Sequence, residues 1–215
     1  MTISGVIFDM DGLMLDTERL EIGLYARISG EMGWPTAESF LRSTLGISDA
    51  AAEFIYKAEY GPSYPFEEIW ERVKEEETEL GNREGLPLRP GLLTLLDKLG
   101  ALKMPLAVAT STERDRAKWK LSRGGIPDRF AVLACGDEVL RGKPEPDIFL
   151  LAAERLGLDP ASCVGFEDSP AGLAGLAKAG IRPVFVKDLA EPPPEVRAQV
   201  WREYDDLAGA VELFG

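Results

Sequence analysis

The chain has 215 residues, 45% hydrophobic and 28% charged, a balance typical of a globular protein with a sizeable core. Its net charge of −13 would repel nucleic acid and anionic membranes, so we expect neither as a partner. It contains no histidine, which excludes a Ser-His-Asp triad and His-ligated zinc. Acid–base chemistry is therefore left to carboxylates, Lys, Tyr or Cys, and an anionic substrate would need a metal or a placed Lys or Arg.

The sequence predicts a soluble, cytoplasmic monomer. No apolar run approaches the length of a transmembrane helix. The first apolar run is interrupted by Asp9 and follows no basic segment, which argues against a signal peptide. Cys135 and Cys163 each lie in an apolar setting and are expected to be buried thiols, not a disulfide or a metal site.

The opening stretch carries the first chemical signal. Residues 6–8, Val-Ile-Phe, are β-branched and aromatic and predict a strand that is buried on both faces. The strand leads to Asp9, and Asp11 follows on the same side, with Gly12 free to form a turn. Two unpaired carboxylates at the edge of a core are costly. A hard cation such as Mg²⁺ would relieve this cost, whereas an Asp-rich turn is the structural alternative for the motif taken alone.

Residues 17–86 predict four successive amphipathic helices, which indicates a helical bundle. The first is expected to end near Gly33, and the next three are expected at 36–45, from an N-cap at Ser48 to about residue 60, and at 65–80. The apolar residues taken as stripes are Leu20, Leu24, Ile28 and Met32 in the first helix and Ala51, Ala52, Ile55 and Ala58 in the third.

From residue 90 onward, predicted strands alternate with predicted helices, the pattern of a parallel sheet. Strands are expected at 106–109, 131–134, 162–166, 184–186 and near 200. Helices are expected at 91–99, 113–123, 146–156, 169–180 and 205–214, and residues 192–194 are expected to form a loop. The predicted fold is α/β, a Rossmann-like parallel sheet core formed by residues 1–16 and 87–215. A four-helix-bundle cap, residues 17–86, is inserted into it.

Polar clusters follow three of these strands, at Asp9–Asp11, Thr110–Thr112 and Glu167–Asp168, and a fourth polar segment surrounds Lys143. The carboxyl ends of parallel strands share one edge of a sheet, so the clusters are expected to converge there. Taken singly, each has a structural alternative, as a helix N-cap, a surface lysine or a favourable charge at a helix start. All four together in this order predict one chemical site.

With these motifs, the chain resembles the haloacid dehalogenase superfamily, in its phosphatase branch with an α-helical cap. That branch includes β-phosphoglucomutase and many sugar-phosphate and phosphoglycolate phosphatases. True dehalogenases of the superfamily lack the second aspartate, so Asp11 argues against that branch. The motifs that carry the resemblance are Asp9–Glu18, Ala109–Ser111, Gly142–Pro146 and Gly165–Ser169.

The resemblance implies a role for each motif. Asp9 would be the nucleophile that forms an aspartyl-phosphate, and Asp11 the general acid and base. Mg²⁺ would be held by the carboxylates of Asp9 and Asp168 and the backbone carbonyl of Asp11. Glu167 would support the metal directly or through water.

The remaining motif residues are expected to bind the phosphoryl group. The resemblance implies that Thr110 and the backbone amide of Ser111 contact its oxygens. Lys143 would neutralise phosphate charge and keep Asp9 ionised. This agrees with the physical chemistry of phosphoryl transfer, which depends on positioning and charge neutralisation.

The predicted function is a Mg²⁺-dependent phosphatase of a small phosphorylated metabolite, a sugar phosphate or similar phosphomonoester, acting through an aspartyl-phosphate. One alternative is a β-phosphoglucomutase-type mutase. Another is a non-catalytic regulator that binds a phosphometabolite, which the presence of every motif residue disfavours. The sequence does not identify the substrate.

The cap is expected to select the leaving group, through Gly46 and Ser48 in a loop between helices. A simple helix–helix turn is the alternative for these two residues. β-Phosphoglucomutases usually carry a histidine and an arginine at two cap positions where this chain has Glu21 and Asp49. Two carboxylates there would repel a second phosphate, which favours hydrolysis over phosphate return. The cations that could reach in from elsewhere are Arg19, Arg42 and Arg83.

Overall fold

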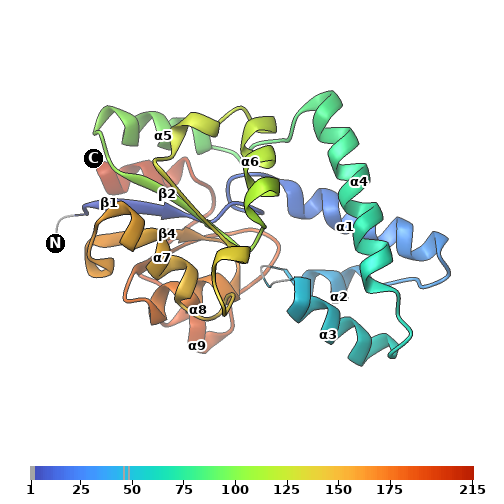
Figure 1. Ribbon diagram of the computed structural model, residues 1–215. Coiled ribbons are helices and arrows are strands. Elements are labelled where there is room, and N and C mark those ends of the chain that lie inside the picture. The colour runs from blue at the N-terminus through green and yellow to red at the C-terminus, as the bar shows by residue number, and fades with distance from the viewer. Residues whose placement is uncertain (1–2, 46, 48) are drawn as a thin grey trace.

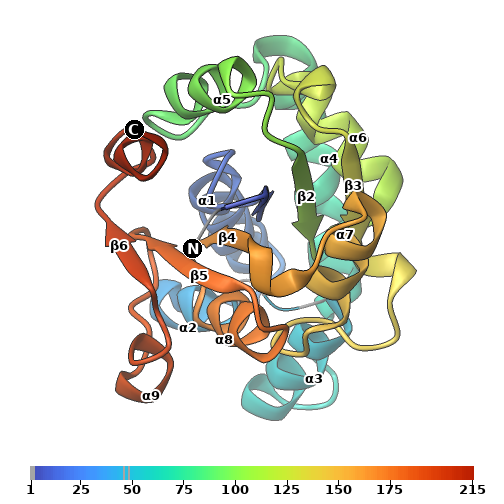
Figure 2. The same ribbon diagram turned by 90° about the vertical axis from the view of Figure 1, so that its left-hand side faces the viewer.

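The computed structural model describes residues 3–45, 47 and 49–215. Its centre is a parallel sheet of six strands in the order β3-β2-β1-β4-β5-β6 (Figures 1 and 2). The strands are β1 (Gly5–Phe8), β2 (Leu106–Thr110), β3 (Val132–Cys135), β4 (Cys163–Glu167), β5 (Arg182–Val186) and β6 (Arg202–Tyr204). The opening strand therefore lies in the middle of the sheet, between strands that come about 100 and 160 residues later.

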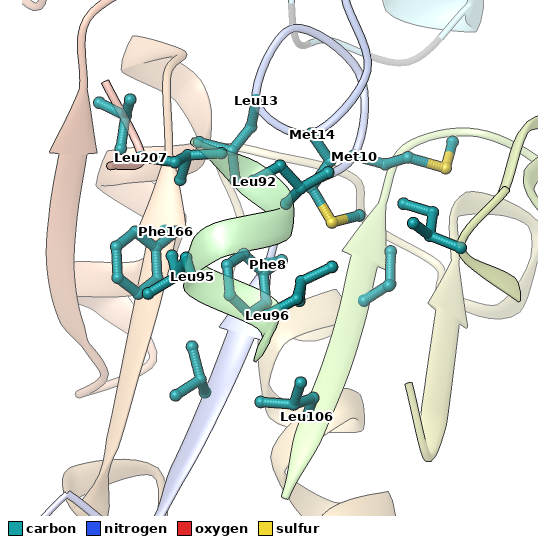
Figure 3. Packing of buried hydrophobic residues seen from close by; sticks show 14 of the residues in the cluster. Phe8, Met10, Leu13, Met14, Leu92, Leu95, Leu96, Leu106, Phe166 and Leu207 are labelled. Carbon is teal, nitrogen blue, oxygen red and sulfur yellow. The ribbon is translucent and has the colours of Figure 1, made fainter. Parts of the chain in front are cut away.

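Strand β1 is buried on both faces, as its composition predicts. Val6 and Phe8 face one hydrophobic layer, whereas Ile7 faces the other. This alternation is the period of two that a pleated strand imposes. Figure 3 shows Phe8 among Leu95, Leu96 and Phe166, and the rings of Phe8 and Phe166 stack at 5.1 Å.

Helices cover both faces of the sheet. The layer packed against Val6 and Phe8 contains α5 and α6 together with a C-terminal 3₁₀ helix, and the opposite layer contains α7 and α8. A short helix, α9, lies between β5 and β6. The bounds are α5 (Leu92–Ala101), α6 (Arg114–Arg123), α7 (Asp147–Leu156), α8 (Pro170–Lys178), α9 (Pro194–Arg197) and the C-terminal 3₁₀ helix (Gly209–Phe214). Three further 3₁₀ turns are Pro127–Arg129, Gly136–Glu138 and Pro160–Ser162.

The remaining four helices lie beyond the carboxyl ends of the strands (Figure 1). They are α1 (Thr17–Glu31), α2 (Glu38–Ser43), α3 (Asp49–Tyr60) and α4 (Phe66–Glu84). They share a hydrophobic cluster of their own, rich in aromatic residues. The predicted α/β core with an inserted helical cap is therefore confirmed, while the domain limits at 16/17 and 86/87 stay a prediction.

Some predicted stripes were placed incorrectly. Of the stripe predicted for the first helix, Leu24 and Ile28 are buried, but Leu20 and Met32, the residue that follows α1, are only partly buried. A strict four-residue spacing drifts around a helix of 3.6 residues per turn. In α3, Ile55 is 38% exposed and Tyr56 is the buried residue. The aromatic cluster of the cap thus determines which face of α3 turns inward.

The C-terminal segment also differs in detail from the prediction. The strand expected near residue 200 is β6, but the expected helix is a 3₁₀ helix that begins only at Gly209. The predicted loop at 192–194 leads into α9, which begins at Pro194, a favoured residue for a first helical turn. Cys135 and Cys163 are buried and unpaired with each other, as predicted. Within the described residues, no helix combines the length and apolarity needed to span a membrane.

Candidate active site

The polar segments predicted to converge do meet at the carboxyl edge of the sheet. Asp9 directly follows β1, while Thr110 and Glu167 are the last residues of β2 and β4. A cavity of about 420 Å³ opens here, between this edge and the cap helices. The predicted residues that line it are Asp9, Asp11, Thr110, Ser111 and Lys143.

Lys143 joins two of the strand ends. Its ammonium donates hydrogen bonds to Asp9 Oδ1 and, at 2.5 Å, to Glu167 Oε1, and the residue is 5% exposed. Burial lowers the pKa of Lys143, but the two carboxylates outweigh this effect and raise it. Burial raises the pKa of Asp9 well above its usual value, with Lys143 opposing and Glu167 adding to the shift. The Asp9 carboxylate therefore needs more positive charge than Lys143 alone supplies.

Glu167 is fixed at the start of α8. Its Oε2 accepts hydrogen bonds from the backbone amides of Asp168 and Ser169, both at 3.0 Å, and from the Ser169 hydroxyl at 2.9 Å. A Cβ at Gly172 would lie 1.8 Å from Glu167 Oε1, so this close approach requires glycine. Because both carboxylate oxygens already accept hydrogen bonds, Glu167 is better placed to support a metal through water than directly.

The residues beside Asp9 suit a hard cation. Carboxylate oxygens of Asp9, Glu167 and Asp168 lie within 4.8 Å of one another, and Asp168 Oδ1 is buried without a hydrogen-bond partner. Burial raises the pKa of Asp168 well above its usual value, and the neighbouring charges of Glu167 and Asp9 add to this. An all-oxygen set of mutually repelling carboxylates is the chemistry that Mg²⁺ favours.

A second acidic group, formed by Glu18, Asp168 and Asp188, overlaps the first. Asp188 is already neutralised, since its Oδ1 pairs with Arg19 and, at 2.9 Å, with Arg89. The first group is therefore the better metal candidate. Gly12 lies against two members of the second group with φ of +82°, and a Cβ there would come within 2.4 Å of Asp168 Oδ2 and 2.7 Å of Glu18 Oε2. Glycine is thus required at the turn after Asp11.

The Asp11 carboxylate accepts hydrogen bonds from more residues than the sequence predicts. Its Oδ1 accepts from Thr17 and Lys120, both at 2.6 Å, and its Oδ2 accepts from Thr112 at 2.8 Å. The Thr110 hydroxyl lies 3.5 Å from the same Oδ2. Burial raises the pKa of Asp11, but the Lys120 ammonium and these hydrogen bonds outweigh it, so the pKa is lowered.

Three of these donors, Thr17, Thr112 and Lys120, escaped sequence reasoning. Thr17 and Thr112 both stand in segments that were identified, Asp9–Glu18 and Thr110–Thr112, but neither was given a role. Lys120 left a weaker signal, because it shares a helix face with the apolar Ala117 and Leu121, where a charged residue is unexpected. A lysine on the buried face of a helix would have pointed to an anionic partner.

The two cap carboxylates have partners that the sequence did not indicate. Glu21 and Asp49 both line the cavity, but neither is a bare carboxylate. Glu21 Oε1 accepts from Lys120 at 2.7 Å, and Asp49 Oδ2 accepts from the Trp70 indole at 2.7 Å. Gly46 and Ser48 lie outside the described residues. Three arginines were expected as cations that could reach the cavity from elsewhere: Arg19, Arg42 and Arg83. Each of them pairs with a carboxylate of a residue that does not line the cavity.

A parallel α/β sheet whose carboxyl edge holds a buried lysine between two carboxylates, beside an acidic cluster suited to a hard cation, fits a hydrolase of phosphate esters. The family model described as haloacid dehalogenase-like hydrolase matches residues 6–186. The chain therefore belongs to the haloacid dehalogenase-like hydrolases.

Individual relatives agree with this assignment. The chain is 34% identical to the phosphorylated carbohydrates phosphatase of Thermotoga maritima, over 85% of this chain and 84% of the relative. It is similar to the crystal structure of CbbY from Rhodobacter sphaeroides in complex with xylulose-(1,5)bisphosphate, with a TM-score of 0.82 and 27% identity over 96% of each chain. A β-phosphoglucomutase from Clostridium difficile shares the fold, with a TM-score of 0.79 and 24% identity over 97% of this chain and 93% of that one.

Proposed function

We propose that this protein is a Mg²⁺-dependent phosphatase that hydrolyses a small phosphorylated carbohydrate or similar phosphomonoester through an aspartyl-phosphate. The observation that carries the proposal is the position of Asp9, whose carboxylate lies on the cavity wall beside Lys143 and the Asp168 carboxylate. The names of the relatives support the phosphate ester and the carbohydrate, and the donor set supports the metal.

In the proposed first step, a carboxylate oxygen of Asp9 forms a bond to phosphorus. The bond between phosphorus and the leaving oxygen breaks, and Asp11 gives a proton to that oxygen. The pKa of Asp11 is lowered in the substrate-free protein, and the negative charge of the bound substrate would raise it and so favour the protonated acid. In the second step, the oxygen of a water molecule bonds to phosphorus while Asp11 takes a proton from the water. The bond between phosphorus and Asp9 breaks, which releases inorganic phosphate and restores the Asp9 carboxylate.

The other cavity residues would bind and neutralise the phosphoryl group. Thr110 and the Ser111 amide are proposed to contact its oxygens at the end of β2, and Lys143 to neutralise part of its charge. Bound Mg²⁺, held by the carboxylates of Asp9 and Asp168 and the carbonyl of Asp11, would supply the remaining positive charge that a dianionic substrate needs here. Gly46 and Ser48 remain proposed substrate contacts from the cap.

Phosphate release from a panel of phosphomonoesters, with and without Mg²⁺, tests the proposal. The panel should contain sugar phosphates, phosphoglycolate and a generic aryl phosphate. We expect Mg²⁺-dependent release, highest for a carbohydrate monophosphate. Release from none of them would favour a non-catalytic protein that binds a phosphometabolite. Equal release in the presence of a chelator would contradict the metal requirement.

The fate of the phosphoryl group should be hydrolysis, not return to a sugar. A mutase must hold a second phosphate in the cap, but all four basic side chains that line the cavity in the described chain already have a carboxylate within 4.0 Å. Of these four side chains only Lys74 lies in the cap, and the Asp49 carboxylate at 3.9 Å would compete with a second phosphate for its charge. With β-glucose 1-phosphate and a trace of the 1,6-bisphosphate, we expect inorganic phosphate to form faster than glucose 6-phosphate. The reverse order would make the protein a mutase.

The Asp168→Ala variant should lose most of its Mg²⁺-induced thermal stabilisation while it keeps its fold. Asp168 Oδ1 is buried and lacks a hydrogen-bond partner, so the metal-free protein loses little when the carboxylate is removed. Relief of repulsion from Asp9 and Glu167 should even stabilise that form. Thermal melts with and without Mg²⁺ measure the effect, with Asp159→Ala, a change at an exposed residue, as the control. A Mg²⁺ shift as large as that of the parent protein would show that Asp168 is not a ligand.

A further inference from the structure

Lys120, on α6, is a buried lysine that lies among carboxylates beside the cavity. Lys120 is 2% exposed, and its ammonium contacts three carboxylates. The distances are 2.6 Å to Asp11 Oδ1, 2.7 Å to Glu21 Oε1 and 3.2 Å to Glu77 Oε1. A lysine is rarely buried this completely unless its ammonium pairs with carboxylates.

The three carboxylates come from different parts of the molecule. Asp11 belongs to the turn after β1, whereas Glu21 lies on α1 and Glu77 on α4, both in the helical cap. Lys120 itself lies on α6, which packs against the sheet. The ammonium is therefore a shared contact between Asp11, at the edge of the sheet, and two helices of the cap, α1 and α4.

A second cation completes the group. Arg116, one turn before Lys120 on α6, pairs with Glu77 Oε2, so Glu77 pairs with both Arg116 and Lys120. Three carboxylates thus face two cations. Lys120 is the one that contacts Asp11, and without it Asp11 Oδ1 would keep only the Thr17 hydroxyl as a donor among the hydrogen bonds described here.

We propose that Lys120 is a positioning residue that orients Asp11 for proton transfer to the leaving group and ties this orientation to the cap through Glu21 and Glu77. The inference rests on the proposed phosphatase function, in which Asp11 is the acid. Asp11 needs a fixed direction because an acid contributes only when its proton lies within hydrogen-bond reach of the departing oxygen. The ammonium on Oδ1 and the Thr112 hydroxyl on Oδ2 together fix the plane of the carboxyl group.

The test exploits the fact that only poor leaving groups need a proton. In Lys120→Met, we expect kcat/KM for alkyl phosphates to fall roughly 100-fold, the lower end of what a general acid contributes. For aryl phosphates of acidic phenols, whose leaving oxygen departs as an anion, the same variant should lose only a few-fold. A plot of log kcat/KM against leaving-group pKa should therefore become steeper. Lys118→Met, a change at an exposed lysine of the same helix that lies 3.9 Å from Asp115, should leave the plot unchanged.

A structural role would give a different result. If Lys120 only stabilised the fold, its loss would lower kcat/KM by the same factor for every leaving group, and this outcome would overturn the inference. The double variant Lys120→Met with Glu77→Gln keeps the net charge of the group and guards against misfolding. It should fold and still show the steeper plot. A parent protein that releases phosphate from no ester would instead refute the phosphatase proposal itself.

Discussion

Asp9→Asn is expected to reduce phosphate release by several orders of magnitude, the largest loss we foresee for a single substitution. In the proposed mechanism, the Asp9 carboxylate makes the bond to phosphorus, and an amide oxygen is a poor nucleophile. Losses of this size are usual when a covalent nucleophile is removed. Phosphate release in the presence of Mg²⁺ measures the effect.

The fold should survive this substitution, because Asn has the shape of Asp and its amide oxygen can still accept the hydrogen bond from Lys143. The Asp9→Asn protein should also bind a phosphomonoester, seen as a thermal shift, since the proposed phosphate contacts remain. Retention of even a tenth of the parent activity would mean that Asp9 holds only the metal. An unfolded variant would show no cooperative melt, so loss of structure is separable from loss of chemistry.

The residues at the sheet edge were predictable because the carboxyl ends of parallel strands all lie along one edge of the sheet. Once Val6–Phe8 is recognised as a buried strand, Asp9 must lie at its carboxyl end, and the same reasoning places Thr110 and Glu167. Short hydrophobic runs determine these positions locally. Lys143 was located by its motif, and the structure shows its ammonium between Asp9 and Glu167.

The contacts between helices were not predictable in the same way. Lys120 meets Glu21 and Glu77 only because α6, α1 and α4 pack at one end of the sheet, and no local pattern states how these helices face one another. The same limit explains the cap stripes. A helix spacing identifies α3, but the aromatic cluster around Tyr56 decides which side is buried. For the same reason, the sequence did not reveal that Glu21 pairs with Lys120 and Asp49 with Trp70, because these partners come from distant segments.

Lys143→Met should be the most destabilising change at the site, lowering the free energy of unfolding by roughly 3–5 kcal/mol in metal-free protein. The ammonium side chain is 2% exposed, and its removal leaves Asp9 and Glu167 buried beside each other without a cation. Lys178→Met is the matched control, because that lysine pairs with Glu145 at the surface and should contribute about 1 kcal/mol or less. Chemical denaturation of both variants measures the difference.

Two conditions should reduce this loss, and both follow from the charge that Lys143 neutralises. Mg²⁺ should restore part of the stability, because it would bind the same carboxylates, yet activity should stay low without the ammonium for the phosphate. Burial already holds the pKa of Asp9 in the folded state above its unfolded value, and removing Lys143 should raise it further. The folded variant then binds more protons than the unfolded chain, so its stability should fall as pH rises between those values. The deficit relative to the parent protein should therefore be smaller at pH 5 than at pH 8, and a deficit that does not change with pH would show that Lys143 acts through packing, not charge.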